Sequence, residues 1–228
     1  MNVVVTNADL GLDDLRVAAM LNDLHRRAKG DRWIFLAAAP AALGAMLTGG
    51  SVFKAAEPYL KNAYIPVDPN QGRLLYQTAR AIRAQTIVEF GTSFGISTIY
   101  LAAAARANNG RVIGSELEPA KVKAARANVA EAGLQQFVDI REGDAMKTLA
   151  NIDAPIEFVL LDGWKDVYVP MIKLLTPKMR SGAVVLADNI FTFKKTLRPY
   201  VQHMQNRSNG FDSVTLPIGS GMEYSLRL

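Results

Sequence analysis

Oxygen-bearing side chains stand directly after two apolar runs that are typical of strands. Asp162 follows the run 156–161, and Asp188 and Asn189 follow the run 183–187. In an open parallel sheet, ligands bind outside the carboxyl ends of the strands, so we expect these three side chains at one edge. Three oxygen donors without thiolate or imidazole favour a hard cation such as Mg²⁺, Mn²⁺ or Ca²⁺. The alternative is that each residue only begins a turn or caps a helix.

A lysine follows the first of these aspartates at a distance of three residues. Lys165 would lie beside the predicted cation, and a neighbouring positive charge and partial burial both disfavour the ammonium form. It is therefore a candidate general base. The alternative is a solvated lysine at the start of a helix.

A glycine-containing turn in the middle of the chain is a second candidate site. The run from Thr86 to Gly95, TIVEFGTSFG, predicts a buried strand and a turn, followed by an alanine-rich helix. Such a unit lets backbone N–H groups and a helix N-terminus approach a nucleotide-like ligand. Glu89, Gly91 and Gly95 give the spacing E-x-G-x-x-x-G, which differs from the G-x-G-x-x-G of dinucleotide binders. The alternative is that the glycines only allow a tight turn.

Acidic residues follow at the ends of the next two predicted strands, 111–116 and 137–141. Glu116 lies 25 positions after Gly91, where a carboxylate can accept hydrogen bonds from ribose hydroxyls; the alternative is an exposed charge at a strand end. Asp144 either holds an adenine amino group or only caps the short helix that follows it. Together with the glycine spacing, these positions favour S-adenosylmethionine over NAD as the ligand.

The order of the apolar runs predicts an α/β fold with a doubly wound, mostly parallel, seven-stranded sheet. Strand and helix patterns alternate five times between Thr86 and Asn206. Two last strands, 211–216 and 222–228, are joined by a short link that requires an antiparallel pair. A loop is expected at 66–72, and helices are expected at 73–84, 97–107, 121–132, 167–178 and 192–206.

The first 62 residues are interpreted as a helical extension, with the main domain at 63–228. A helix through Leu15 and Leu24 is expected, capped by Asp9 or Asp13 and ended by Gly30, and a short helix is expected at 51–60.

An apolar segment lies between those two helices, at 33–47. It is shorter than the roughly 18 apolar residues that span a bilayer, and Pro40 and Gly44 interrupt it. A buried or dimer-facing helix is therefore favoured over membrane contact.

Composition excludes several classes of site. The chain has no cysteine and only two histidines, which excludes disulfides, thiolate metal sites and a cysteine nucleophile, and argues against a histidine-based zinc site. The net charge of +5 comes from dispersed basic residues that do not alternate with aromatics, so solvated helix faces are favoured over a nucleic-acid groove. No cleavable signal is visible at the N-terminus, and a cytoplasmic location is expected.

Two short runs resemble the catechol and caffeoyl-CoA O-methyltransferase group. These are DGWKDVY from Asp162 to Tyr168 and LADN from Leu186 to Asn189. The resemblance extends from about Val67 to the C-terminus, and it includes the run Val88 to Gly91 and the hairpin at Pro217 to Gly219. It implies a class I methyltransferase fold in which a final antiparallel strand is inserted in the sheet, with S-adenosylmethionine and a divalent metal as cofactors. A homodimer is also expected from it.

The resemblance also implies a role for individual positions. Around the cofactor it places the methionine part near Ser93 and Ser97, the ribose on Glu116, and the adenine near Asp144 and Trp164. The implied cofactor-binding residues are Val67, Glu89, Gly91, Ser93, Gly95, Ser97, Glu116, Asp144, Ala145, Asp162 and Trp164. The implied metal ligands are Asp162, Asp188 and Asn189, with Lys165 as the base.

The chain departs from the catechol enzymes at two points. Gly163 stands where those enzymes have a histidine after the metal-binding aspartate, and no clear counterpart of their late substrate-orienting glutamate follows Asn189. The predicted function is therefore methyl transfer to a hydroxyl of a small acceptor, a vicinal dihydroxy aromatic, without commitment to catechol itself. The alternatives are a non-catalytic protein that binds a nucleoside-like ligand and a nicotinamide-dependent oxidoreductase, which the missing third glycine disfavours.

Overall fold

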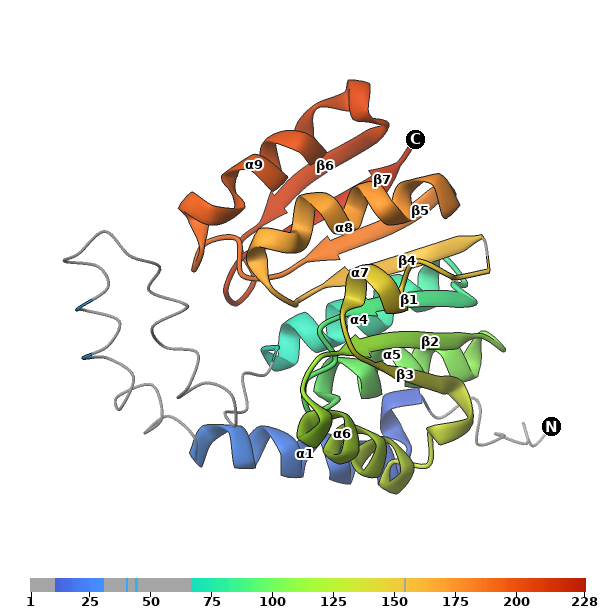
Figure 1. Ribbon diagram of the computed structural model, residues 1–228. Coiled ribbons are helices and arrows are strands. Elements are labelled where there is room, and N and C mark those ends of the chain that lie inside the picture. The colour runs from blue at the N-terminus through green and yellow to red at the C-terminus, as the bar shows by residue number, and fades with distance from the viewer. Residues whose placement is uncertain (1–10, 31–39, 41–43, 45–66, 154) are drawn as a thin grey trace.

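One sheet forms the centre of the structure, a computed structural model that describes residues 11–30, 40, 44, 67–153 and 155–228. Its strands lie in the order β3-β2-β1-β4-β5-β7-β6 (Figure 1). Their bounds are β1 Thr86–Phe90, β2 Arg111–Glu116, β3 Val138–Glu142, β4 Ile156–Leu161, β5 Met179–Ala187, β6 Phe211–Leu216 and β7 Met222–Arg227.

The strand directions confirm the predicted topology. All neighbouring pairs among β1 to β5 are parallel, whereas β7 runs antiparallel to both β5 and β6 and lies between them. The fold is thus the expected doubly wound, mostly parallel α/β sheet with an antiparallel strand inserted near its C-terminal edge.

Helices cover both faces of the sheet. In Figure 1, α8 and α9 lie on the near face, and α4 and α5 lie behind the sheet. Because successive strand residues point to opposite faces, Ile87 and Phe158 belong to the core around α5, and Val88 and Val159 belong to the core under α8. The helices are α1 Leu15–Gly30, α4 Pro69–Ala81, α5 Ile96–Ala107, α6 Pro119–Glu131, α7 Ala145–Thr148, α8 Tyr168–Leu175 and α9 Lys194–Gln205.

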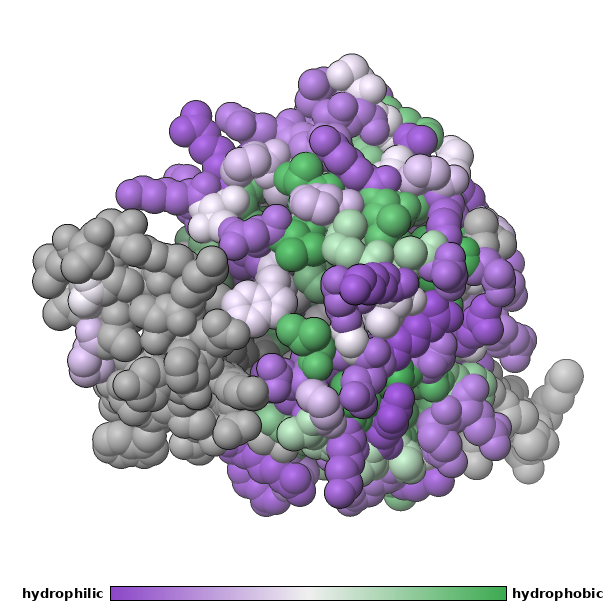
Figure 2. All heavy atoms as spheres, in the orientation of Figure 1, coloured by the Kyte–Doolittle hydropathy of each residue, from purple (hydrophilic) through white to green (hydrophobic). Residues whose placement is uncertain are grey.

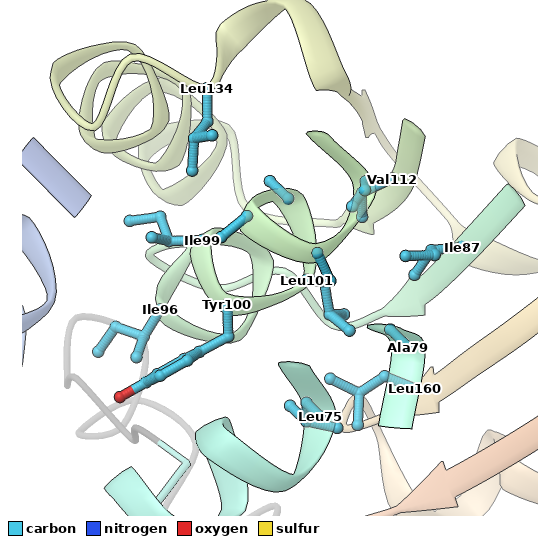
Figure 3. Packing of buried hydrophobic residues seen from close by; sticks show 14 of the residues in the cluster. Leu75, Ala79, Ile87, Ile96, Ile99, Tyr100, Leu101, Val112, Leu134 and Leu160 are labelled. Carbon is cyan, nitrogen blue, oxygen red and sulfur yellow. The ribbon is translucent and has the colours of Figure 1, made fainter. Parts of the chain in front are cut away.

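Helix α5 is buried along most of its length. Figure 3 shows Ile99 directed toward Leu134 beyond α6, and Leu101 lying between Ile87 of β1 and Leu75 of α4, all with no exposed surface. Four consecutive alanines in this helix let the surrounding elements approach closely. The N-terminus of α5, which follows the glycine turn, is thereby held rigidly against the sheet.

The predicted loop at 66–72 is wrong from Pro69 onward, because α4 begins there. The Asp68 carboxylate accepts a hydrogen bond from Asn70 N at 2.8 Å, and Gln71 Oε1 accepts one from Asp68 N at 2.8 Å, which forms a capping box with a proline in the first turn. Gly72 lies inside this helix and does not mark a loop. A Cβ there would lie 2.3 Å from the Tyr100 ring, so glycine lets α4 pack against α5.

Other predicted boundaries shift by a few residues. Strand β5 begins at Met179 rather than 183, with a register irregularity against β4 and a positive φ of 79° at Gly182. The predicted helix 167–178 is an α-helix only at α8, and a 3₁₀ turn precedes it and another follows it. Helix α6 begins at Pro119, and Gly133 follows its end with a φ of 71°.

Helix α1 belongs to the main hydrophobic core. Val17 and Leu24 have no exposed surface and pack in the cluster that contains α4 and α5. Asp14, not the predicted Asp13, caps the helix, because its carboxylate accepts a hydrogen bond from Arg16 N at 2.9 Å. The other predicted cap, Asp9, lies outside the described residues. The predicted helix 51–60 and the segment 33–47, apart from Pro40 and Gly44, also lie outside the described residues.

The face of the molecule seen in Figure 2 is mostly hydrophilic where it is described. Figure 2 shows apolar side chains gathered in a few separate groups surrounded by hydrophilic ones. Among the helices that the structure describes, none is long and apolar enough to cross a membrane.

A buried ion pair joins α1 to α5. Arg106 Nη1 donates to Asp14 Oδ2 at 2.9 Å, and both side chains are 7% exposed. Burial alone would raise the pKa of Asp14, but the hydrogen bonds and charge of Arg106 and the backbone N–H of Arg16 outweigh it and lower that pKa. The pair therefore stabilises the fold while Asp14 is ionised.

We predict that Asp14→Asn lowers the free energy of unfolding by about 3 kcal/mol near pH 7, because Arg106 keeps a buried charge without a counterion. Urea denaturation measures this loss. Asp13→Asn, at the exposed neighbouring position, is the matched control and should stay within about 0.5 kcal/mol of the wild type.

The same pair predicts a pH dependence. Since the folded state lowers the pKa of Asp14 below its ordinary value of 3.8, the stabilisation is complete above that value and is lost as the pH falls through the folded-state pKa. The difference in unfolding free energy between wild type and Asp14→Asn should shrink below about pH 4. A difference that grows as the pH falls would contradict this assignment.

Candidate active site at the carboxyl ends of the strands

Backbone hydrogen bonds continue past the ends of the parallel strands. In each case the N–H of a residue just beyond one strand donates to the last or next-to-last carbonyl of its neighbour. The bonds are Gly143 N to Glu116 O at 2.9 Å, Gly91 N to Ser115 O at 3.1 Å, Asp162 N to Phe90 O at 2.8 Å and Asp188 N to Leu161 O at 3.0 Å. They place the predicted residues after β1, β3, β4 and β5 along one edge of the sheet.

Asp162 is a largely buried carboxyl, with a side chain 16% exposed. Burial is the main reason why the pKa of Asp162 is raised to about 7. The positive charge of Lys165 lowers this pKa, and the negative charge of Asp188 raises it. A group whose ionised form is so disfavoured gains from a positive charge beside it. The end of β4 is therefore a place where a cation would be stabilised.

Asp188, at the end of β5, is 2% exposed and is held by three donors. Its Oδ1 accepts hydrogen bonds from Gln71 Nε2 at 2.6 Å, from Asn189 N at 2.6 Å and from the Ser220 hydroxyl. These described bonds all fall on Oδ1, so Oδ2 is the oxygen available to a ligand. Neither Gln71 nor Ser220 was expected from the sequence, because Gln71 fell in the predicted loop and Ser220 in the hairpin.

Asn189 adopts a left-handed backbone conformation with a φ of 69°. Its Nδ2 donates to Ser220 Oγ at 3.2 Å, so its amide oxygen remains for another partner. Within the described residues, no three or more histidine, cysteine, aspartate or glutamate side chains form a metal-binding group. A hard cation would thus have two carboxylates and one amide oxygen here, a sparse oxygen set that suits Mg²⁺, which keeps several waters.

Lys165 begins a 3₁₀ turn directly after β4, and its side chain is only 9% exposed. Its Nζ lies 3.3 Å from Asp162 Oδ1 and 3.0 Å from the hydroxyl of Tyr168, and it stands 5.8 Å from the ring centre of Phe193. The alternative of a solvated lysine is therefore wrong. The amine is held at the same edge as the two aspartates.

The glycine turn fits closely against the next strand. Gly91 has a φ of 97°, and a Cβ there would lie 2.6 Å from Gly163 N and 2.7 Å from the carbonyl of Asp162. Gly95 precedes α5 with a φ of 87°. Both glycines are thus required by backbone conformation, and Gly91 also by a contact with backbone.

Glu89 supports this turn from inside the core. Its carboxylate has no exposed surface and accepts hydrogen bonds from Ser97 Oγ at 2.6 Å, Thr98 Oγ1 at 2.5 Å and Thr92 Oγ1 at 3.0 Å. Burial raises the pKa of Glu89, and the three hydroxyls oppose that rise. In this structure Glu89 and Ser97 bind one another and fix the turn to α5.

Glu116 is engaged by the backbone through both oxygens. Oε2 accepts from Ser93 N at 2.8 Å, where Ser93 has a φ of 49°, and Oε1 accepts from Glu118 N at 3.0 Å. The alternative of a free exposed charge is therefore wrong. Glu116 joins the end of β2 to the glycine turn, and each oxygen keeps capacity for a second donor.

Of the remaining predicted cofactor residues, Asp144 and Ala145 follow the end of β3, and Trp164 follows the end of β4. Asp144 accepts a hydrogen bond from Met146 N at 2.9 Å and so caps α7, as the alternative predicted, while the adenine contact stays a prediction. Ala145 is buried in the first turn of α7, Trp164 is partly buried against the core under α8, and Val67 is 2% exposed before α4.

The structure shows the surroundings of the two positions at which the chain departs from the catechol enzymes. A Cβ at Gly163 would lie 2.4 Å from the Phe90 ring, so Phe90 occupies the space that a larger residue would need. Glu223, the glutamate that follows Asn189 in the chain, has no exposed surface and binds Gln205 and Ser213. It does not reach the strand-end site as an acceptor-orienting group.

We predict that Gly91→Ala is more destabilising than Gly143→Ala. Both positions have positive φ, which costs about 1–3 kcal/mol in alanine, but Gly143 has only Thr148 Cγ2 nearby at 3.5 Å. The backbone contact at Gly91 should add a further 1–3 kcal/mol, roughly. Thermal and urea unfolding of the two variants measure the difference, and equal losses would show that the contact between β1 and β4 is not a constraint.

Comparisons with known proteins find similarity to methyltransferases. Residues 88–190 match a family described as "Methyltransferase domain". A catechol O-methyltransferase of Niastella koreensis is 34% identical over 137 residues, which are 58% of this chain and 62% of that protein. A catechol O-methyltransferase of Mycobacterium tuberculosis is 36% identical over 127 residues, 55% of this chain and 57% of that protein. The chain thus spans about three fifths of the length of these relatives.

Solved structures share the fold. Cofactor-bound Rv0187 from MTB has a TM-score of 0.68 and 28% identity, covering 83% of this chain and 95% of that one. The O-methyltransferase TomG from Streptomyces achromogenes, in complex with SAM, has a TM-score of 0.66 and 25% identity, covering 84% and 89%. The sheet order and the strand-end site define a class I methyltransferase fold. Within that class, the chain is similar in sequence to catechol O-methyltransferases.

Proposed function

We propose that this protein transfers a methyl group from S-adenosylmethionine to a hydroxyl of a small acceptor, a vicinal dihydroxy aromatic, with the help of a divalent cation. The observation that carries the proposal is the buried amine of Lys165, held between Asp162 and Tyr168 at the edge that also presents Asp188. The homodimer and the cytoplasmic location expected from the sequence stay predictions.

The donor site is proposed at the ends of β1, β2 and β3. The N-terminus of α5 and the glycine turn after Gly91 can approach the methionine part, and Glu116 has capacity for the ribose hydroxyls. Asp144 and Trp164 would flank the adenine. The complex of TomG with SAM supports this choice of donor, because TomG shares the fold over most of this chain. The bound donor supplies an electrophilic sulfonium methyl group.

The cation site is proposed at the ends of β4 and β5. Asp162, Asp188 and Asn189 are the protein ligands, and the raised pKa of Asp162 supports the presence of a positive charge beside it. A cation bound there would hold two acceptor oxygens and favour ionisation of the one that is methylated.

The chain itself contributes a proton acceptor and a fixed geometry. Lys165 Nζ takes the proton from the acceptor hydroxyl while the oxygen forms a bond to the methyl carbon, and the carbon–sulfur bond breaks to leave S-adenosylhomocysteine. The backbone at Gly91 lies directly against the backbone at Gly163, and this contact fixes the position of the donor turn relative to the acceptor edge. Such positioning supplies much of the rate in a two-substrate reaction.

We predict that Lys165→Ala lowers kcat by about 10²–10⁴-fold, the usual contribution of a general base, with little change in affinity for S-adenosylmethionine. Methyl transfer from labelled donor to catechols and hydroxycinnamate thioesters measures the rate, and calorimetry measures donor affinity. Lys173→Ala, at an exposed position on α8, is the matched control and should be as active as the wild type.

Metal removal is a separate test of the cation. EDTA should abolish methyl transfer, and added Mg²⁺ should restore it, because the acceptor oxygens would otherwise lose the charge that holds them and favours ionisation. Full activity in EDTA would refute the cation while leaving the donor site intact. Calorimetric titration with S-adenosylmethionine and with NAD decides the donor, and binding of NAD alone would overturn the proposed function.

A further inference from the structure

The hydroxyl of Tyr168 lies inside the protein directly against Lys165. Tyr168 has no exposed surface, so it cannot touch an acceptor, yet its oxygen is 3.0 Å from Lys165 Nζ. The same oxygen lies 2.9 Å from Leu161 O and 3.3 Å from Asp188 O. It therefore contacts the amine and the backbone at the ends of both β4 and β5.

The direction of these hydrogen bonds follows from the groups involved. A phenol has one hydrogen to donate, and the carbonyls of Leu161 and Asp188 can only accept, so that hydrogen points toward them. The lone pairs of the oxygen then remain for Lys165, and Tyr168 can accept a hydrogen bond from Nζ but not donate one.

This arrangement gives the lysine a second anchor. A lysine side chain is long and flexible, and an amine beside a carboxylate is drawn onto it unless something else holds it. Here Nζ is shared between Asp162 Oδ1 at 3.3 Å and the Tyr168 hydroxyl at 3.0 Å. The longer of these distances is the one to the carboxylate, as expected if the hydroxyl holds the amine away from it.

We propose that Tyr168 is a positioning residue that holds Lys165 Nζ away from Asp162 and toward the acceptor, using the carbonyls at the ends of β4 and β5 as its own support. The proposal rests on the proposed function, in which Lys165 takes the proton of the acceptor hydroxyl.

A neighbouring tyrosine provides a matched control. Tyr200 on α9 is 1% exposed, and its ring stacks edge-on against Tyr168 with ring centres 5.4 Å apart. Among the described residues, its hydroxyl has no hydrogen-bond partner. Tyr200→Phe thus removes the same atom from the same core without breaking a described hydrogen bond.

The first experiment compares steady-state kinetics of the wild type, Tyr168→Phe and Tyr200→Phe at saturating Mg²⁺. Tyr168→Phe should lower kcat by about 10- to 100-fold, as expected for a misplaced reacting group, with KM for donor and acceptor changed less than about twofold. Tyr200→Phe should leave all three parameters within about twofold of the wild type. Circular dichroism and thermal unfolding check that both variants are folded.

A double-mutant cycle tests whether the effect passes through Lys165. If Tyr168 only positions the lysine, Tyr168→Phe should change the residual rate of Lys165→Ala by less than about twofold, because no amine is left to position. A further 10-fold loss in the double variant would overturn the proposal and show that Tyr168 acts on the backbone at the cation site instead.

A crystal structure of Tyr168→Phe gives a readout that does not depend on activity. Lys165 Nζ should move onto the Asp162 carboxylate, and an unchanged position of Nζ would overturn the proposal even if the Lys165→Ala rate is too low to measure. Two results distinguish an error in the general base from an error in the positioning role. Lys165→Ala as active as the wild type would overturn the base itself, whereas an inactive Lys165→Ala with a fully active Tyr168→Phe would overturn only the positioning role.

Discussion

The backbone hydrogen bonds that run past the ends of β1, β2, β3, β4 and β5 fix where each functional side chain begins. Asp162 N is bonded to Phe90 O, and Asp188 N to Leu161 O, so the order of residues along the edge is set by the sheet and not by the loops. Loops at such an edge can vary in length, but their first residues stay in register. The arrangement of donor turn, amine and carboxylates is therefore a direct consequence of strand order.

Burial of ionisable groups is the cost of this arrangement, and hydrogen bonds offset it. Asp188 is nearly inaccessible, yet three donors from three different segments meet one of its oxygens. Glu89 is met by three hydroxyls in the same way. An unpaired carboxylate in these places would cost several kcal/mol, roughly, so the donors are as necessary to the fold as the carboxylates are to the site.

Much of the fold could be predicted from the sequence. The strand 156–161 was predicted with its observed bounds, because a strand covered on both faces is a nearly continuous apolar run. The strands 86–90 and 111–116 also have their predicted bounds. The start of α4 was missed because Gly72 is a turn signal in isolation, whereas its reason here is the Tyr100 ring of another helix. The capping box at Asp68 and Gln71 was a readable local signal for the correct start.

The site could be predicted only where its residues follow strands. Asp162, Lys165 and Asp188 were found because strand ends are visible in the chain, and the structure brings them to one edge. Gln71 and Ser220 were not found, since they lie 117 and 32 residues from Asp188 and only the folded sheet brings them to it. Tyr168 was part of the recognised run, but nothing in the sequence shows that its hydroxyl turns back beneath Lys165.

The capping box of α4 has a mechanical consequence for the end of β5. The side-chain amide of Gln71 takes part in both contacts. Its oxygen accepts the hydrogen bond from Asp68 N in the first turn of α4, and its nitrogen donates to the Asp188 carboxylate. Fraying of that turn and release of the aspartate are therefore one event. A substitution that unwinds α4 by a single turn would loosen the end of β5 without touching it, and tightening the helix start would stiffen the same carboxylate.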